Sequence, residues 1–267
     1  MVRTFGIVNL TRDSFSDGGQ FFSPEAALQH ARQLRAEGAD VLDLGAESTH
    51  PDAEDVPAIE EIRRLSPVVA ALLAEGAELS VDTCKPQVMR TMVAMGVHWL
   101  NDVHGFRDPE SLAVAAAAPA NVRFVVMFSR SRSGRADRPA DATEEVLAEL
   151  QTFFAERVQT MARAGVAKER LVLDPGMGFF LGRTAAPSLL VLKHLRELQQ
   201  HGVPLLVSVS RKSLVGEVTG RTVEQRGPGT LAAELWAARH GAEWIRSHDP
   251  AAFRDAWAVE CAIEGAR

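Results

Sequence analysis

The chain places two serines, an arginine and a lysine in one short run, Ser208-Val209-Ser210-Arg211-Lys212-Ser213. The run follows an apolar segment, residues 203–207, that is typical of a buried strand, and it precedes a segment near Ser213 that is typical of a helix. A helix start offers free N–H groups and the positive end of the helix dipole. Arginine can bind an anion through paired hydrogen bonds, and lysine adds a point charge. The run therefore predicts an anion site, although a solvated basic turn explains it equally well when it is taken alone.

Six further predicted strands also end in polar side chains. They are Asn9, Asp43 with Glu47, Asp82 with Thr83, Asn101 with Asp102, Asp174, and Arg246 with His248. A single Asp or Asn at a strand end commonly caps the next helix or closes a turn. The same explanation is weak for so many strand ends at once, and this favours one shared site.

The polar residues fall into two chemical groups. The cationic group comprises His50, Arg211, Lys212, Arg246 and His248, and it suits a phosphorylated ligand. The second group comprises Asp43, Glu47, Asp82, Asn101 and Asp174, and it suits a planar heterocycle with N–H donors because ionised carboxylates only accept hydrogen bonds. We therefore expect an electron-poor ring held beside an anionic leaving group. The chain has no His/Cys cluster with zinc spacing, no Walker A loop and no nucleophile elbow.

The elements that must position these residues alternate between strand and helix. The predicted strands are 5–9, 41–44, 79–81, 97–101, 122–127, 170–173, 203–207 and 243–246. The predicted helices are 24–37, 58–74, 86–95, 109–118, 143–164, 187–200, 230–240 and 251–263, besides the one near Ser213. About eight β/α units without a linker predict an α/β fold, a TIM (β/α)8 barrel, as a single domain over residues 1–267. A doubly wound open sheet is the alternative, but no glycine-rich dinucleotide fingerprint follows any strand.

Composition excludes several classes of protein. The chain has 267 residues, 46% of them hydrophobic and 24% charged, and a net charge of −6, which argues against nucleic acid as a partner. Two distant cysteines, Cys84 and Cys261, suit a reducing cytoplasm rather than a disulfide framework. No apolar run reaches the roughly 18 residues of a membrane span, and no signal-peptide core follows Met1, so we expect no membrane partner.

Seven blocks of sequence resemble dihydropteroate synthase, a family of the folate pathway, over essentially the whole chain. They are GIVNLTRDSFSDGG (6–19), DLGAESTHP (43–51), SVDTCKP (80–86), NDVHG (101–105), LDPGMGF (173–179), SVSRKS (208–213) and IRSHD (245–249). The family condenses 6-hydroxymethyl-7,8-dihydropterin pyrophosphate with 4-aminobenzoate to give 7,8-dihydropteroate and pyrophosphate. The resemblance implies a transferase of the pterin-binding barrel type, usually a homodimer that uses Mg²⁺.

The resemblance also implies a role for each matching residue. Pterin would be held by Asp82, Asn101, Met127, Asp174 and Lys212. Pyrophosphate would be held by Asn9, His50, Arg246 and His248, with Mg²⁺ near Asn9. The aminobenzoate pocket would be bordered by Phe15, Thr49, Pro51, Phe179, Phe180, Ser210 and Arg211. The catalytic set would be Asp82, Asp174, Lys212 and Arg246.

The charge layout suggests an SN1-like mechanism. The bond to pyrophosphate breaks first and leaves a pterin methylene cation, which Asp82 and nearby carboxylates can stabilise. Cationic groups and Mg²⁺ stabilise the departing pyrophosphate. The amine of 4-aminobenzoate then adds, with no covalent enzyme intermediate.

Four positions depart from the family pattern. Arg12 stands where the family usually has proline, His50 where it has arginine, and Phe128 where it has histidine. The fourth departure is Gly178-Phe179-Phe180-Leu181-Gly182, which with residues 50–53 resembles the sulfonamide-insensitive subgroup of the family. Phe128 does not match that subgroup.

Two other functions compete with the synthase. One is a pterin-binding barrel that transfers a methyl group from methyltetrahydrofolate to a corrinoid, but such an enzyme has no use for Arg211-Lys212, Arg246 and His248. The other is a non-catalytic homologue that binds pterin or a partner, and His50 and Phe128 are its only support.

Overall fold

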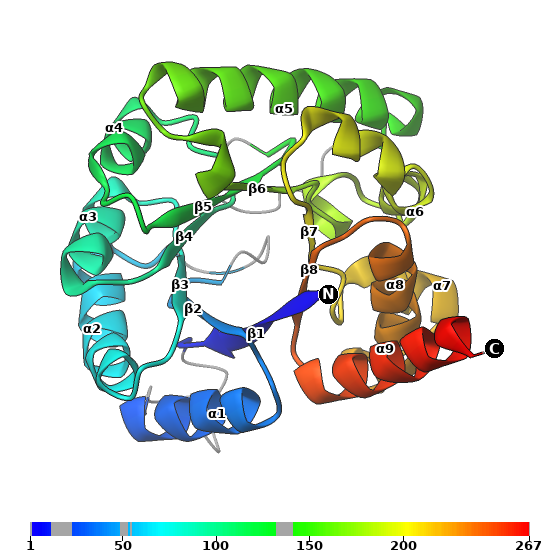
Figure 1. The fold of residues 1–267 in the computed structure, drawn as a ribbon, viewed down its shortest axis with the longest axis horizontal. Coiled ribbons are helices and arrows are strands. Elements are labelled where there is room, and N and C mark those ends of the chain that lie inside the picture. The colour runs from blue at the N-terminus through cyan, green and yellow to red at the C-terminus, as the bar shows by residue number, and fades with distance from the viewer. Residues whose placement is uncertain (1, 12–22, 49–52, 54, 132–140, 267) are drawn as a thin grey trace.

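The computed structural model describes residues 2–11, 23–48, 53, 55–131 and 141–266. Within these residues, eight parallel strands form one sheet in the order β6-β5-β4-β3-β2-β1-β8-β7. A bridge between Leu173 and Leu205 joins the two outer strands, so the sheet curls into a barrel inside a ring of helices (Figure 1). The predicted TIM barrel is confirmed.

The observed elements lie close to the predicted ones. The strands are β1 Arg3–Asn9, β2 Val41–Gly45, β3 Leu79–Asp82, β4 Trp99–Asp102, β5 Arg123–Met127, β6 Leu171–Asp174, β7 Leu206–Val207 and β8 Trp244–Ser247. The helices are α1 Pro24–Ala36, α2 Ala58–Ala74, α3 Pro86–Met95, α4 Pro109–Ala117, α5 Val146–Arg163, α6 Ala186–Lys193, α7 Ser213–Thr219, α8 Gly227–Arg239 and α9 Pro250–Gly265. No helix in the described part of the chain is both long and apolar enough to cross a membrane.

Several predicted elements differ in extent from the observed ones. The helix expected over 187–200 ends as α6 and continues as a 3₁₀ turn, Leu195–His201. The strand expected over 203–207 shrinks to two residues, because Pro204 has no N–H to donate and contributes only its carbonyl, to the N–H of Leu173. The helix expected from 230 begins earlier, at Gly227, since a proline suits the first helical turn.

Three helices begin with the same pattern of a capping side chain followed by proline. Ser23, Asp108 and Asp249 each accept a hydrogen bond from a backbone N–H in the first turn of α1, α4 and α9. The proline that follows has a fixed backbone angle suited to a helix start. These caps end the loops that follow the strands, and so they fix where the barrel mouth meets the helix layer.

The barrel interior is built in two layers. The lower layer is an apolar plug made of Phe5, Val41, Trp99, Val125, Val172, Leu206 and Trp244. Phe5, Trp99 and Trp244 meet edge to face, with ring centroids 5.1–5.2 Å apart. Because side chains alternate along a strand, the residue two positions after each plug residue also points inward. In five strands that residue is Asp43, Asn101, Met127, Asp174 or Arg246.

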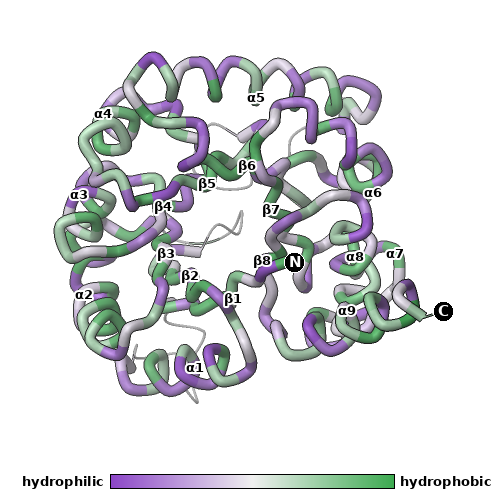
Figure 2. The backbone as a smooth tube through the Cα atoms, viewed as in Figure 1, coloured by the Kyte–Doolittle hydropathy of each residue, from purple (hydrophilic) through white to green (hydrophobic). Residues whose placement is uncertain are grey.

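The remaining strand residues face the helices. Val8, Leu44 and Phe124 belong to the large core between strands and helices. Figure 2 shows hydrophobic residues along much of the barrel wall and on the helix turns that face it, and hydrophilic residues on many of the outer helix turns and at β8. The apolar plug fills the barrel toward the N-terminal ends of the strands. A ligand inside the barrel can therefore contact polar side chains only at the mouth, where the strands end.

Candidate active site

Arg246 is the centre of the polar layer. Its Nε donates to Asp43 Oδ2 at 2.5 Å, and its Nη2 donates to Asp82 Oδ2 at 2.9 Å. Asn101 Nδ2 donates to the same oxygen of Asp43 at 3.2 Å. Asp43 is fully buried, so its charge depends on Arg246 for compensation. The structure thus brings together Asp82, Asn101 and Arg246, and it binds Arg246 to carboxylates.

Several buried polar atoms in this layer or next to it lack a hydrogen-bond partner among the described residues. Among the described residues, Asp43 Oδ1, Asn101 Oδ1 and Ser80 Oγ are buried without a hydrogen-bond partner. Burying a polar atom unpaired costs about 1–3 kcal/mol, so such atoms cluster where a ligand supplies the missing partner. A ring with N–H donors has the required chemistry. Sequence reasoning missed Ser80, although it stands two positions before Asp82 and so shares its inward direction.

Burial shifts the pKa values of three ionisable side chains at the barrel mouth toward neutral pH. Burial raises the pKa of Asp82 to about 7, with Arg246 opposing the shift. Burial also raises the pKa of Asp174, against the attraction of Lys212. The pKa of Lys212 falls to about 8 through burial, although Asp174 favours its charge. Burial alone would lower the pKa of Arg246, but Asp43 and Asp82 outweigh it and raise that pKa. Such matched acids and bases are typical of reactive sites.

His248 does not carry the positive charge that the sequence predicts. Burial, and then the positive charge of Arg211, lower the pKa of His248 to about 3. Its ring Nδ1 lies 2.9 Å from Ser210 Oγ, which also accepts the backbone N–H of His248 at 3.1 Å. His248 is therefore a neutral hydrogen-bonding group, and the cationic side of the mouth comes from the other residues.

The turn before α7 contains a residue in the left-handed region of the backbone. Arg211 has a φ of 56°, which is uncommon for a side chain other than glycine. Its N–H donates to Thr230 Oγ1 at 3.0 Å, and its carbonyl accepts from Arg226 Nη1 at 2.8 Å. These contacts hold the turn while the side chain of Arg211 stays exposed.

Met127 and Phe180 form an apolar edge to the site. They pack with Val103, and the half-buried Cys84 and Phe179 lie against them. Lys212 Nζ lies 5.3 Å from the ring centroid of Phe180, within the range of a cation–π contact. Phe180 is only 6% exposed, whereas Phe179 is more open. Both phenylalanines thus border the mouth, and Phe180 also serves as packing.

Phe128 points away from the site. It lies one residue after the inward Met127, belongs to the core under the helices and contacts Phe153 at a centroid distance of 5.3 Å. The departure from the family pattern at this position therefore falls in the helix layer, where a large apolar ring fits.

Glu47 belongs to a different cluster from the one expected. Lys85 Nζ donates to both Glu47 and Glu61, and Thr83 donates to Glu61 Oε2 at 2.9 Å. Glu47 Oε1 accepts the backbone N–H of Val56 at 3.1 Å. The grouping of Glu47 with the carboxylates of the mouth was wrong, because the loop after β2 turns its side chain toward Lys85.

Asp102 behaves as a structural cap. Its two oxygens accept the backbone N–H groups of His104 at 2.8 Å and Phe106 at 2.7 Å.

Four predicted site residues, Phe15, Thr49, His50 and Pro51, lie outside the described residues, as does Arg12.

The residues available for a metal ion are few. Within the described residues no group of three His, Cys, Asp or Glu side chains could hold one. Asn9, half-buried at the end of β1, offers a single amide oxygen. That donor set fits Mg²⁺, which often binds through one or two protein oxygens, water and substrate phosphates.

Known proteins resemble this chain over nearly its full length. The family model described as pterin binding enzyme matches residues 5–248. Dihydropteroate synthase type-3 of Escherichia coli is 43% identical over 264 residues, 98% of this chain and 100% of that protein. Xanthomonas albilineans dihydropteroate synthase with 4-aminobenzoic acid is 44% identical at a TM-score of 0.91, over 100% of this chain and 94% of that one. The same enzyme with 7,8-dihydropteroate is 43% identical at a TM-score of 0.86, over 100% and 95%. The chain belongs to the pterin-binding enzymes and, among them, to the dihydropteroate synthase family.

Proposed function

We propose that this chain condenses 6-hydroxymethyl-7,8-dihydropterin pyrophosphate with 4-aminobenzoate and releases 7,8-dihydropteroate and pyrophosphate. The observation that carries the proposal is the polar layer on the apolar plug, where Arg246 joins Asp43 and Asp82 beside unpaired acceptors. A pterin ring can donate N–H groups to those acceptors. The relatives with 4-aminobenzoic acid and with 7,8-dihydropteroate support this choice of substrates.

In this proposal the pterin lies at the barrel mouth. Asp82, Asn101, Asp174 and Lys212 hold its polar edge, and Met127 packs against the ring. Burial has already brought the pKa of Asp82 to about 7 and that of Lys212 to about 8, so small changes on binding can set their charges.

The leaving pyrophosphate faces the cationic side of the site. The bond between the pterin methylene carbon and the pyrophosphate oxygen breaks, and the electron pair leaves with pyrophosphate. The ionised carboxylate of Asp82 stabilises the resulting cation. Arg246 holds the pyrophosphate by charge, while Asn9, His50 and His248 contribute hydrogen bonds. The amine of 4-aminobenzoate then forms the new C–N bond and loses a proton.

Asn9 would hold Mg²⁺ together with oxygens of the pyrophosphate. The ion would neutralise part of the charge on the leaving group. Phe15, Thr49, Pro51, Phe179, Phe180, Ser210 and Arg211 would border the 4-aminobenzoate. Phe180 narrows that pocket in this proposal, which lowers sensitivity to sulfonamides.

The deciding experiment combines purified protein with both substrates and Mg²⁺, and it follows pyrophosphate release and 7,8-dihydropteroate formation. Omitting either substrate should stop 7,8-dihydropteroate formation, and adding EDTA should stop both signals. Binding of the pterin substrate without any product would support the non-catalytic alternative. Methyl transfer from methyltetrahydrofolate to a corrinoid protein would support the other alternative.

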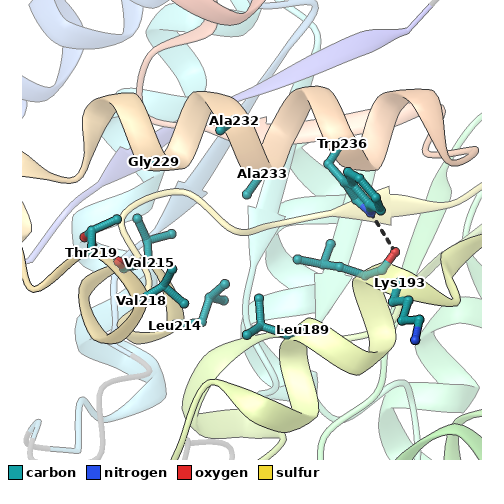
Figure 3. A pocket seen from close by; sticks show the side chains of 11 residues that line it. Leu189, Lys193, Leu214, Val215, Val218, Thr219, Gly229, Ala232, Ala233 and Trp236 are labelled. Carbon is teal, nitrogen blue, oxygen red and sulfur yellow. Dashed lines mark hydrogen bonds between the residues drawn. The ribbon is translucent and has the colours of Figure 1, made fainter.

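We also propose that the chain forms a homodimer through its outer helices. A cavity of about 520 Å³ lies between α6, α7 and α8, and its lining is almost entirely apolar (Figure 3). Leu189, Val218 and Trp236 at its rim are exposed, and Val218 is 62% accessible. Trp236 donates its indole N–H to the carbonyl of Leu192 at 3.0 Å, which fixes the ring at the rim of this cavity. Exposed apolar surface of this kind favours a second copy of the chain.

Light scattering on three proteins tests the dimer. Wild type should have twice the mass of the 28.9 kDa chain, and Val218→Glu should shift toward the monomer. Ile59→Glu is the matched control, because Ile59 is 75% exposed on α2 and lies outside this cavity. A monomeric wild type would refute the proposal.

Residues 1–267 act as one catalytic domain in this proposal, in the cytoplasm. The free thiols of Cys84 and Cys261 support a reducing compartment.

A further inference from the structure

We propose that Ser210 is a positioning residue for His248: its hydroxyl donates to Nδ1 and so fixes the tautomer that presents Nε2–H to the anion. The functional consequence rests on the proposed pyrophosphate site. The tautomer itself does not depend on any ligand, so the two ideas can fail separately.

The two residues come from neighbouring strand ends. Ser210 follows β7 and His248 follows β8, and these strands pair in parallel. Ser210 is 5% exposed, so its hydroxyl must find partners within the protein. Among the described residues it has two, both on His248: the backbone N–H at 3.1 Å and the ring Nδ1 at 2.9 Å.

Counting hydrogens selects one arrangement. A serine hydroxyl has one hydrogen to donate and two lone pairs. The backbone N–H of His248 takes one lone pair of Ser210. If Nδ1 also carried a hydrogen, Ser210 would accept twice, and its own O–H would be buried with no acceptor in the described structure. When Ser210 donates to Nδ1, every group is paired, and the only ring hydrogen stands on Nε2.

A neutral donor suits this place in the site. Burial, then Arg211 and Arg246, disfavour a charged imidazole at position 248 and lower its pKa to about 3. His30 and Lys212 act in the same direction. A neutral ring can serve an anion only through an N–H, because its bare nitrogen would repel the phosphate oxygens. Ser210 thus decides whether His248 helps or hinders anion binding.

Nitrogen NMR of the substrate-free enzyme, labelled with ¹⁵N-histidine, tests the tautomer directly. His248→Gln identifies the His248 signals by their loss. We expect Nδ1 to resonate as a bare nitrogen and Nε2 as a protonated one in wild type. Ser210→Ala should move both toward averaged values. Ser66→Ala is the control, since Ser66 donates to the Ile62 carbonyl inside α2, and it should change neither. A protonated Nδ1 in wild type would overturn the proposal even if Ser210→Ala failed to fold.

A double-mutant cycle tests the function. Ser210→Ala should raise the KM for the pterin pyrophosphate about threefold to tenfold, the effect of one neutral hydrogen bond, with a smaller change in the KM for 4-aminobenzoate. Glutamine keeps an N–H₂ donor without a tautomer to fix, so Ser210→Ala should add little in the His248→Gln background. Ser210→Thr keeps the hydroxyl and should restore the wild-type KM. An equal loss in both backgrounds, or a change in the KM for 4-aminobenzoate alone, would show that Ser210 does not act through His248.

Discussion

Replacing Asp82 by asparagine removes one negative charge from the barrel mouth and nearly preserves the shape of the side chain. The amide oxygen can still accept the hydrogen bond that Arg246 Nη2 makes to Asp82 at 2.9 Å. The variant therefore separates the charge of Asp82 from its contacts. We expect opposite effects on catalysis and on stability.

The kcat of Asp82→Asn should be lower than that of wild type. A carboxylate that stabilises a developing cation acts mainly in the transition state, and losing such a partner costs about 10²–10³-fold, or about 2.7–4 kcal/mol. The KM for the pterin pyrophosphate should change much less, because the hydrogen-bonding shape is kept.

The free energy of unfolding of Asp82→Asn should rise, relative to that of wild type, as the pH rises. Burial raises the pKa of Asp82 from 3.8 to about 7. The folded state therefore binds the proton more tightly than the unfolded state does. The stabilisation is complete below about pH 3.8 and is lost as the pH rises through about 7, by at most about 4 kcal/mol at 1.36 kcal/mol per unit. Asparagine does not titrate, so the variant should gain about 3 kcal/mol on wild type between pH 5 and pH 8.

Thermal melts at the two pH values and steady-state kinetics with both substrates are the assays. Glu234→Gln is the matched control. Glu234 is a buried acid on α8 whose pKa burial raises to about 8, and it lies outside the polar layer. It should show the same pH-dependent gain in stability with kcat within about twofold of wild type, since no transition-state charge is lost. An unchanged kcat in Asp82→Asn with only a raised KM would refute the cation-stabilising role. A pH-independent difference in melting temperature would refute the electrostatic argument.

Three further changes have defined outcomes. Phe180→Gly should lower the sulfonamide inhibition constant about tenfold, or about 1.4 kcal/mol, with a smaller change in the KM for 4-aminobenzoate, because it removes a clash with the bulkier ligand. Equal shifts in both constants would mean that Phe180 is only packing. His50→Arg should flatten any weakening of pterin pyrophosphate affinity between about pH 6 and pH 8, since imidazole titrates near ~6.5 and arginine does not. An unchanged pH profile would exclude an anion contact. Phe128→His should destabilise the fold by about 1–3 kcal/mol in a denaturant titration and leave kcat unchanged, because Phe128 packs on Phe153. A large loss of kcat would place Phe128 in the site.

The sequence predicts the barrel well because its strands are short apolar runs between helix caps and helix-ending glycines. The differences occur where a backbone detail decides the outcome. Pro204 cannot donate to a neighbouring strand, so β7 is shorter than its hydrophobic run. The last part of the helix expected over 187–200 is a 3₁₀ turn, Leu195–His201, which is capped by Gly202 with a φ of 60°. Neither feature changes which residues line the core.

Two features of the site depend on three-dimensional surroundings. Histidine at position 248 suggests a cation, but only the folded structure shows that burial and neighbouring positive charge keep it neutral. Glu47 follows β2 closely enough to suggest the barrel mouth. Its direction is set by Lys85 and by the N–H of Val56, which are 38 and nine positions away in sequence. A spacing rule along one strand carries no information about such partners.

Alternation along the strands could have resolved more of the site than strand ends alone. Trp99, Val125 and Val172 fill the plug, and the residues two positions later, Asn101, Met127 and Asp174, all reach the polar layer. A residue one position away from an inward residue points outward, which is why Phe128, one residue after Met127, packs under the helices. The same rule separates Asn101 from Asp102, whose carboxylate caps a loop rather than entering the mouth. A departure from the family pattern at an outward position therefore weighs little against catalysis, whereas one at an inward position would weigh heavily.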